Sequence, residues 1–178
     1  DSDGEDRPVE IKNLIYKIIE EPAKSVVAKR VKRSEGPIFQ LLYQLHKLMT
    51  FIFTGKKINF GNYSCLIKKD ICSLIEEGSL WSSFSGSVKK IIHNFNEIDS
   101  FRGLRYFGPS KMSIYNLAVH SFSIIAVFRY NVFLRSSFII IILSFLTKSF
   151  GVAVIIFQIF LILFNLLIFI VSMRENKK

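Results

Sequence analysis

The chain has 178 residues, half of them hydrophobic, and carries a formal net charge of +10 at pH 7. This length suits one modest domain with an appendage. A basic chain can bind nucleic acid. Here, however, the charge lies beside long apolar stretches, so nucleic acid is excluded as the expected partner and an anionic membrane surface is favoured.

The first residues predict a helix that follows a short extended segment. Asp6, Pro8 and Glu10 supply a capping side chain, a proline in the first turn and an acid near the positive end of the helix dipole. Apolar residues then recur at helical spacing and form one face, made of Ile11, Leu14, Ile15, Ile18 and Ile19. The sequence opens on Asp-Ser-Asp-Gly without an initiator methionine or a signal peptide, so we expect it to be a fragment of a longer protein.

A buried strand is expected next, at residues 25–28, followed by the basic run 29–33. The strand, helix, strand order predicts an α/β domain with a parallel sheet. Residues 38–53 are amphipathic, but they are more apolar than an ordinary surface helix. This pattern predicts a helix in the membrane interface, at about residues 38–54. A core helix of the globular domain is the alternative.

The middle of the chain predicts a loop and strand at 59–67 and helices at 69–77 and 81–92. Residues 112–128 carry no charged side chain, and His120 is their only titratable group. We expect a second interfacial helix there, leading into the membrane.

Residues 149–173 predict a membrane-spanning helix, because they are 25 consecutive residues without a charge. At about 1.5 Å per residue they extend roughly 37 Å, more than the ~30 Å hydrocarbon core. The shorter run at about 132–147 predicts a first span, with a tight turn at 148–151. Basic residues lie outside both ends, which predicts that both ends are cytoplasmic. A core helix of a soluble protein is the alternative for these apolar runs.

These patterns divide the chain into four regions: a soluble domain at 1–111, an interfacial or juxtamembrane helix at 112–130, a transmembrane hairpin at 131–173 and a cytoplasmic tail at 174–178. The hairpin also offers a surface for homo-oligomerisation.

Two acids at the start of the chain are candidate metal ligands. In an extended segment, residues two apart point the same way, so Asp1 and Asp3 can face one site. Such a pair can hold Mg²⁺ or Mn²⁺ together with diphosphate oxygens. The cation would stabilise the charge that develops on a departing nucleoside diphosphate.

The context of these acids resembles a known family. Asp-Ser-Asp-Gly-Glu-Asp-Arg-Pro before an amphipathic helix resembles the Asp-x-Asp-x-Gln-Asp-Pro-Pro segment of family 2 glycosyltransferases that use dolichyl or undecaprenyl phosphate. The resemblance implies that Asp1, Asp3 and Glu5 serve the metal and the donor diphosphate. Glu5 departs from the family's commoner glutamine.

A second matching segment lies far downstream. Residues 105–112, Arg-Tyr-Phe-Gly-Pro-Ser-Lys-Met, resemble the family's Arg-x-x-Gly-x-Ser-Lys motif, which precedes its interfacial helix. Ser110 and Lys111 supply a hydroxyl donor and a cation, while Arg102 and Arg105 add guanidinium groups suited to phosphate oxygens. The resemblance also assigns Arg30, in the basic run after the first strand, to the acceptor phosphate.

The resemblance implies the C-terminal half of a GT-A (Rossmann-like) α/β domain, held at the cytoplasmic face of a bacterial inner membrane. The implied reaction is a metal-assisted, inverting transfer of a sugar from a nucleoside diphosphate sugar to a polyprenyl (lipid) phosphate. The nucleotide-binding half of the family's domain is not among the matched residues, so the fragment alone is expected to be inactive. Two alternatives stay open: transfer to a hydroxyl of a lipid-linked glycan, and a non-catalytic membrane-anchored scaffold of the same fold.

Overall fold

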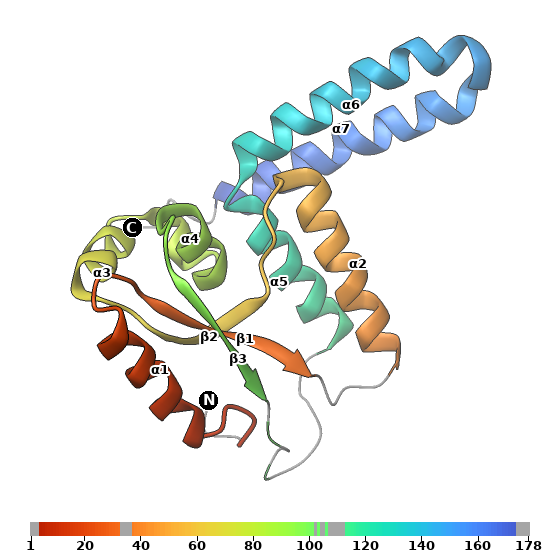
Figure 1. The fold of residues 1–178 in the computed structure, drawn as a ribbon. Coiled ribbons are helices and arrows are strands. Elements are labelled where there is room, and N and C mark those ends of the chain that lie inside the picture. The colour runs from red at the N-terminus through yellow and green to blue at the C-terminus, as the bar shows by residue number, and fades with distance from the viewer. Residues whose placement is uncertain (1–3, 33–36, 102, 104–105, 107–112, 174–178) are drawn as a thin grey trace.

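The computed structural model describes residues 4–32, 37–101, 103, 106 and 113–173. Over these residues the protein is a mixed α/β structure with a small sheet and a long helical hairpin (Figure 1). Its elements, in chain order, are α1 (Val9–Glu20), β1 (Val26–Lys32), α2 (Pro37–Thr54), β2 (Phe60–Cys65), α3 (Lys68–Ile75), the 3₁₀ turn η1 (Gly78–Trp81), α4 (Phe84–Ile91), β3 (Asn96–Phe101), α5 (Ile114–Ala126), α6 (Arg129–Phe150) and α7 (Val152–Ser172).

The sheet has the order β2-β1-β3, with β1 in the centre. β1 and β3 are parallel, with Val27 opposite Glu97. The prediction of a wholly parallel sheet is wrong, because β2 runs antiparallel to β1, with Val26 opposite Cys65. The physical reason is the path of the chain. It leaves β1 at its carboxyl end, and α2 with the loop after it returns the chain to the same edge, so β2 must run back (Figure 1).

Three further expectations near the sheet need correction. The first helix is confirmed, but Pro8 occupies its N-cap position and not its first turn. β1 continues through the basic run to Lys32, because its pairing with β3 continues to Phe101, and Arg30 therefore lies within the strand and not after it. β3 itself was not predicted.

The remaining helices lie close to their predicted positions, with two shifted ends. The helix expected at 81–92 begins at Phe84, because the Ser83 hydroxyl accepts a hydrogen bond from the backbone N–H of Gly86 (3.2 Å). The tight turn expected at 148–151 is reduced to Gly151, since α6 continues helically to Phe150. Gly151 has a φ of +52°, a conformation that glycine adopts at little cost.

Alternation along β1 separates two parts of the core. Val26 and Ala28 pack with Leu14 of α1 on one face of the sheet. Val27 points to the other face, where it belongs to a cluster with residues of β2, α4 and α5. These directions follow from the two-residue period of a strand. Each fully buried valine contributes about 1.5–3 kcal/mol through loss of apolar surface from water.

α5 connects the sheet to the hairpin. Ile124 packs in the cluster on the sheet, whereas Ile125 packs in a second cluster with buried residues of the C-terminal helices and α2, namely Phe53, Val132, Leu161, Phe164 and Ile168. Neighbouring residues of one helix therefore belong to both cores, and this sharing fixes the hairpin against the domain.

The hairpin is held together partly by polar groups. Asn165 donates to the Ser136 hydroxyl (2.7 Å), and Gln158 donates to the Ser144 hydroxyl (3.0 Å). Large apolar side chains cover its outside. The segments Arg129–Thr147 and Val152–Ser172 are each long and apolar enough to cross a membrane.

α2 is tied to the base of the hairpin at its last turn. The Arg135 guanidinium donates to the carbonyl of Ile52 (3.2 Å), and the Asn131 amide donates to the carbonyl of Thr54 (3.4 Å). Cationic and amide donors satisfy carbonyls that a helix end leaves without intrahelical partners. Gly55, with a φ of +71°, lies so close to Arg135 that a Cβ there would overlap the guanidinium.

Candidate functional site at the carboxyl edge of the sheet

The carboxyl ends of β1 and β3 define the candidate site. Because the two strands are parallel, their carboxyl ends meet at one edge, and Arg30 lies opposite Ser100 in the register. The basic run that ends β1 and the segment that follows β3 therefore begin side by side. Just before this edge, Lys29 and Asp99 form an ion pair with 3.6 Å between Nζ and Oδ1. It is largely exposed, so it adds little to stability.

The N-terminal loop, residues 4–7, lies against the segment that follows β3. The backbone N–H of Gly103 donates to the carbonyl of Glu5 (2.9 Å). A Cβ at Gly103 would lie 2.6 Å from the Gly4 carbonyl oxygen and 3.1 Å from Cγ of Arg7. The approach is thus too close for any residue other than glycine without a shift of the backbone.

The same loop contacts Tyr106. Gly4 has a φ of +85°, and a Cβ on it would lie 2.8 Å from the nearest carbons of the Tyr106 ring. Glycine is required here for two reasons, the left-handed backbone and the aromatic ring packed against it. The two segments that resemble the family are about one hundred residues apart in sequence. They are in contact here through residues that neighbour the predicted functional side chains.

β2 fixes the other end of the loop. The Tyr63 hydroxyl donates to the carbonyl of Arg7 (2.9 Å). Partial burial raises the pKa of Tyr63, and the carboxylates of Asp6 and Glu10 raise it further. Both effects disfavour a phenolate, so the hydroxyl remains the donor that this contact needs. Glu10 is itself buried and accepts a hydrogen bond from Asn13 (3.0 Å).

Most of the predicted site residues lie outside the described part of the chain. These are Asp1, Asp3, Arg102, Arg105, Ser110 and Lys111. Of the other two, Glu5 is buried in the loop that contacts Gly103, and the backbone of Arg30 belongs to β1. Among the described residues, the structure brings together Gly4 and Glu5 with Gly103 and Tyr106.

Four residues that shape the site were not among the predicted site residues: Gly4, Tyr63, Gly103 and Tyr106. A signal was present for the glycines, because Gly4 directly follows the Asp-x-Asp pair and Gly103 directly follows Arg102. Glycine beside a charged motif is typical of a close backbone approach. The tyrosines carried no such signal, since their contacts are made between distant segments.

The proposed donor set is chemically suited to a hard divalent cation. Carboxylate oxygens are the ligands that Mg²⁺ and Mn²⁺ prefer, and Glu5 is a buried acid whose backbone contacts Gly103. Within the described residues, no group of three histidine, cysteine, aspartate or glutamate side chains is arranged to hold a metal. Asp1 and Asp3 are not among those residues, so the metal site stays a prediction.

An apolar cleft links the surroundings of the site to the hairpin. It lies between α2 and α5, has a volume of about 140 Å³ and is lined mainly by leucine, isoleucine, methionine and phenylalanine side chains, among them Leu45, Met49, Leu117 and Phe122. On the outer side of α2, Leu41, Leu45 and Leu48 are exposed. In Figure 1 both helices lie at the base of the hairpin, on the side of the sheet from which it projects.

Fold and site together define a mixed α/β domain joined to two helices that are long and apolar enough to cross a membrane. Comparison of the chain with protein-family models, with curated proteins and with solved structures finds no match.

Proposed function

We propose that this chain is the C-terminal part of a family 2 glycosyltransferase of the GT-A fold, which transfers a sugar from a nucleoside diphosphate sugar to a polyprenyl phosphate. The observation that carries the proposal is the contact of Gly4 and Glu5 with Gly103 and Tyr106 at the carboxyl edge of β1 and β3. In α/β sheets, ligands bind outside the carboxyl ends of the strands. Described residues that neighbour the two motifs thus lie together at one edge of the sheet.

The roles follow from the chemistry of the side chains. Asp1, Asp3 and Glu5 would hold Mg²⁺ or Mn²⁺, which stabilises negative charge on the leaving diphosphate when it is bound. The cationic and hydroxyl groups would orient the acceptor phosphate; they are Arg30, Arg102, Arg105, Ser110 and Lys111.

The reaction needs no strong general base. An oxygen of the acceptor phosphate attacks C1 of the sugar, and the bond between C1 and the oxygen of the β-phosphate breaks. The electron pair of that bond leaves with the nucleoside diphosphate, and the configuration at C1 inverts. The attacking oxygen is already ionised at neutral pH, so no proton must be removed from it.

The membrane placement brings the acceptor to the site. We place α2 and α5 in the cytoplasmic interface of a bacterial inner membrane, with the hairpin spanning the bilayer and both of its ends in the cytoplasm. The exposed leucines of α2 and the cleft between α2 and α5 support this arrangement. An acceptor lipid lying in the interface would then present its headgroup to the site, which is a proximity effect.

The surface of α1 supports a larger catalytic domain. Val9, Ile15, Tyr16 and Ile19 are all exposed on this helix. A cluster of large apolar side chains on one helix of a soluble domain is typical of a surface that other protein covers. Further strands and helices of a GT-A domain would supply that cover.

The test uses the full-length protein in membranes supplied with a panel of radiolabelled nucleotide sugars. We expect one label to enter the organic-extractable lipid fraction and a chelator to stop its transfer. Asp1→Asn and Asp3→Asn should each lower the rate by at least about 100-fold, because each removes charge aimed at the leaving group. Glu76→Gln, a matched change at the exposed residue that follows α3, should leave the rate unchanged.

The other outcomes identify the alternatives. Mild acid should release the label as a free monosaccharide if the sugar is attached directly to the lipid phosphate, whereas release of the label within a larger glycan indicates transfer to a hydroxyl of a lipid-linked glycan. Sugar transfer that is the same with and without the Asp1 and Asp3 carboxylates would overturn the catalytic role and support a scaffold.

A further inference from the structure

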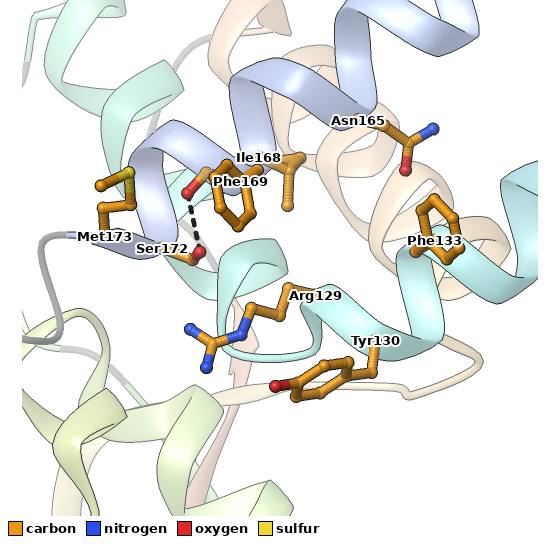
Figure 2. A pocket seen from close by; sticks show the side chains of 8 residues that line it. All are labelled: Arg129, Tyr130, Phe133, Asn165, Ile168, Phe169, Ser172 and Met173. Carbon is orange, nitrogen blue, oxygen red and sulfur yellow. Dashed lines mark hydrogen bonds between the residues drawn. The ribbon is translucent and has the colours of Figure 1, made fainter.

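A groove opens where the two helices of the hairpin separate near its base. It has a volume of about 540 Å³ and lies between the first turns of α6 and the last turns of α7. Figure 2 shows Arg129, Tyr130 and Phe133 lining it from α6, and residues that include Ile168 and Phe169 lining it from α7. Asn165 stands toward its inner end, where the hydrogen bonds to Ser136 hold the helices together.

The lining divides into a cationic mouth and an apolar wall. The Arg129 guanidinium lies 5.1 Å from the centre of the Tyr130 ring, an arrangement that holds the cation by its attraction to the aromatic face. Phe133 and Phe169 provide exposed aromatic surface beyond it. No acidic residue is among the described residues that line the groove. Its chemistry therefore complements a molecule with an anionic head and an apolar body.

The position of the groove fits the membrane boundary. Arg129 is the first residue of α6, and the segment Arg129–Thr147 is the first one apolar enough to cross a bilayer. Arginine side chains at such ends reach the headgroup region while their helices stay in the hydrocarbon. The cytoplasmic leaflet carries anionic lipids that attract these cations.

The groove is separate from the candidate site at the carboxyl edge of the sheet. α5 begins at Ile114, after the segment that follows β3, and ends at Ala126, three residues before Arg129. A 13-residue helix spans about 20 Å, and Figure 1 shows its two ends on opposite sides of the domain. A phosphate held by Arg129 is therefore out of reach of a reaction at the sheet edge.

We propose that this groove binds one anionic phospholipid of the bilayer. Its phosphodiester lies against Arg129 and the Tyr130 hydroxyl, and an acyl chain lies along Phe133 and Phe169. A second copy of the chain fits less well. A two-fold contact would place the same patch on both sides and bring two copies of Arg129 together without an acid from the groove between them. The inference depends on the hairpin lying in a membrane and does not depend on sugar transfer.

The test measures lipid retention by the full-length protein, purified in a neutral detergent. The protein is mixed with phosphatidylglycerol or with phosphatidylcholine of the same acyl chains, and the bound lipids are counted by native mass spectrometry. We expect one phosphatidylglycerol to be retained, with a preference of about tenfold over phosphatidylcholine. Both lipids carry the phosphodiester, but the quaternary ammonium of phosphatidylcholine offsets its negative charge and weakens its attraction to Arg129. Arg129→Gln should bring the ratio close to one, and Arg129→Lys should keep most of the preference.

Lys148→Gln is the matched control, because it removes one positive charge at the opposite end of the hairpin. It should retain the wild-type preference. Phe169→Ala should weaken the binding of both lipids by removing part of the apolar wall. Equal retention of the two lipids by the wild-type protein would overturn the proposal. So would an unchanged preference in Arg129→Gln, or a protein that is dimeric without lipid and becomes monomeric in Phe169→Ala.

Membrane placement and sugar transfer have separate readouts. If alkaline carbonate extracts the full-length protein from membranes, the hairpin does not span the bilayer and the proposed lipid site loses its basis. Asp1→Asn tests the catalytic proposal through label transfer alone. It should leave the lipid preference unchanged, so the two proposals can fail independently.

Discussion

The sheet region and the hairpin distribute their polar and apolar groups in opposite ways. In the sheet region Val26, Val27 and Val88 are fully buried. In the hairpin the hydroxyl group of Ser136 lies between the helices and bonds to Asn165, while Phe145 is 79% exposed. The sheet region thus keeps its large apolar side chains inside, whereas the hairpin adds polar contacts between its helices and carries many large apolar side chains outside.

The difference is the one expected if the hairpin lies in a membrane, as proposed above, and the sheet region in water. In water the burial of apolar surface drives packing, and this accounts for the sheet region. In hydrocarbon there is no such force between apolar helices, so close packing and interhelical hydrogen bonds hold them together. α5 lies where the two regions meet, because Ile124 belongs to the cluster on the sheet and Ile125 to the cluster of the hairpin. Four substitutions test this comparison.

The largest effect is expected from Val27→Asn, because it places an amide in the centre of the sheet core. We expect a loss of about 3–5 kcal/mol in the free energy of unfolding of the sheet region, from the lost apolar burial and the unpaired amide. Hydrogen exchange of β1 and β3, followed by mass spectrometry, measures it. Val31→Asn, at a half-exposed position of the same strand, should cost far less. Equal losses at the two positions would contradict the assignment of the core.

Gly103→Ala should have the next largest effect, because its Cβ would lie 2.6 Å from the Gly4 carbonyl oxygen. Overpacking of this kind costs about 1–3 kcal/mol, and we expect residues 4–7 to lose their protection from hydrogen exchange. In the full-length protein, label transfer should fall by about tenfold or more. Gly151→Ala is the comparison. It strains the hairpin turn, where no atom is within 4 Å of the added Cβ, and it should leave residues 4–7 protected.

Asn165→Ala tests the inverted polarity of the hairpin. Removing the amide breaks its hydrogen bonds with Ser136 and should cost about 0.6–2 kcal/mol, the range found for polar contacts between membrane helices. Titration of the reconstituted protein with sodium dodecyl sulfate, monitored by the separation of α6 and α7, measures the loss. Leu166→Ala alters an exposed neighbour and should cost less. A greater loss at Leu166 would mean that apolar packing dominates in the hairpin.

The smallest effect is expected from Glu21→Gln, on the surface of the sheet region. Hydrogen bonds from Lys17 and then Lys24 lower the pKa of Glu21 to about 2. Because the folded pKa lies below the ordinary value, the ionised carboxylate stabilises the fold above about pH 4.5, and this contribution disappears as the pH falls toward 2. The difference in melting temperature between wild type and Glu21→Gln should therefore be present at pH 6 and close by pH 2.

High salt provides the control for this pair, since an exposed ion network is screened. The difference at pH 6 should shrink in 1 M NaCl. A difference that grows as the pH falls would have the wrong sign for a depressed carboxyl pKa.

The sequence alone was sufficient for the elements whose signal is local. Periodicity predicted α1 and α2, and the uninterrupted apolar run predicted α7. The limits of these elements were less predictable, because a single hydrogen bond decides some of them. The hydroxyl of Ser83 begins α4, and the φ of Gly151 ends α6. At the candidate site, the sequence supplied the charged motifs but not the contacts between the segments that carry them.

Tertiary structure alone decided the features that depend on distant partners. β3 contains Glu97 and Asp99, so its composition does not favour a strand, and it forms because β1 offers a parallel edge. β2 runs antiparallel because α2 returns the chain to the edge that it left. Gly4 meets Tyr106, and Gly103 meets Glu5, only once these strands are paired. Local patterns encode helices and membrane spans, because residues close in sequence form them. The candidate site is built from segments that are distant in sequence, so it requires contacts that no short segment contains.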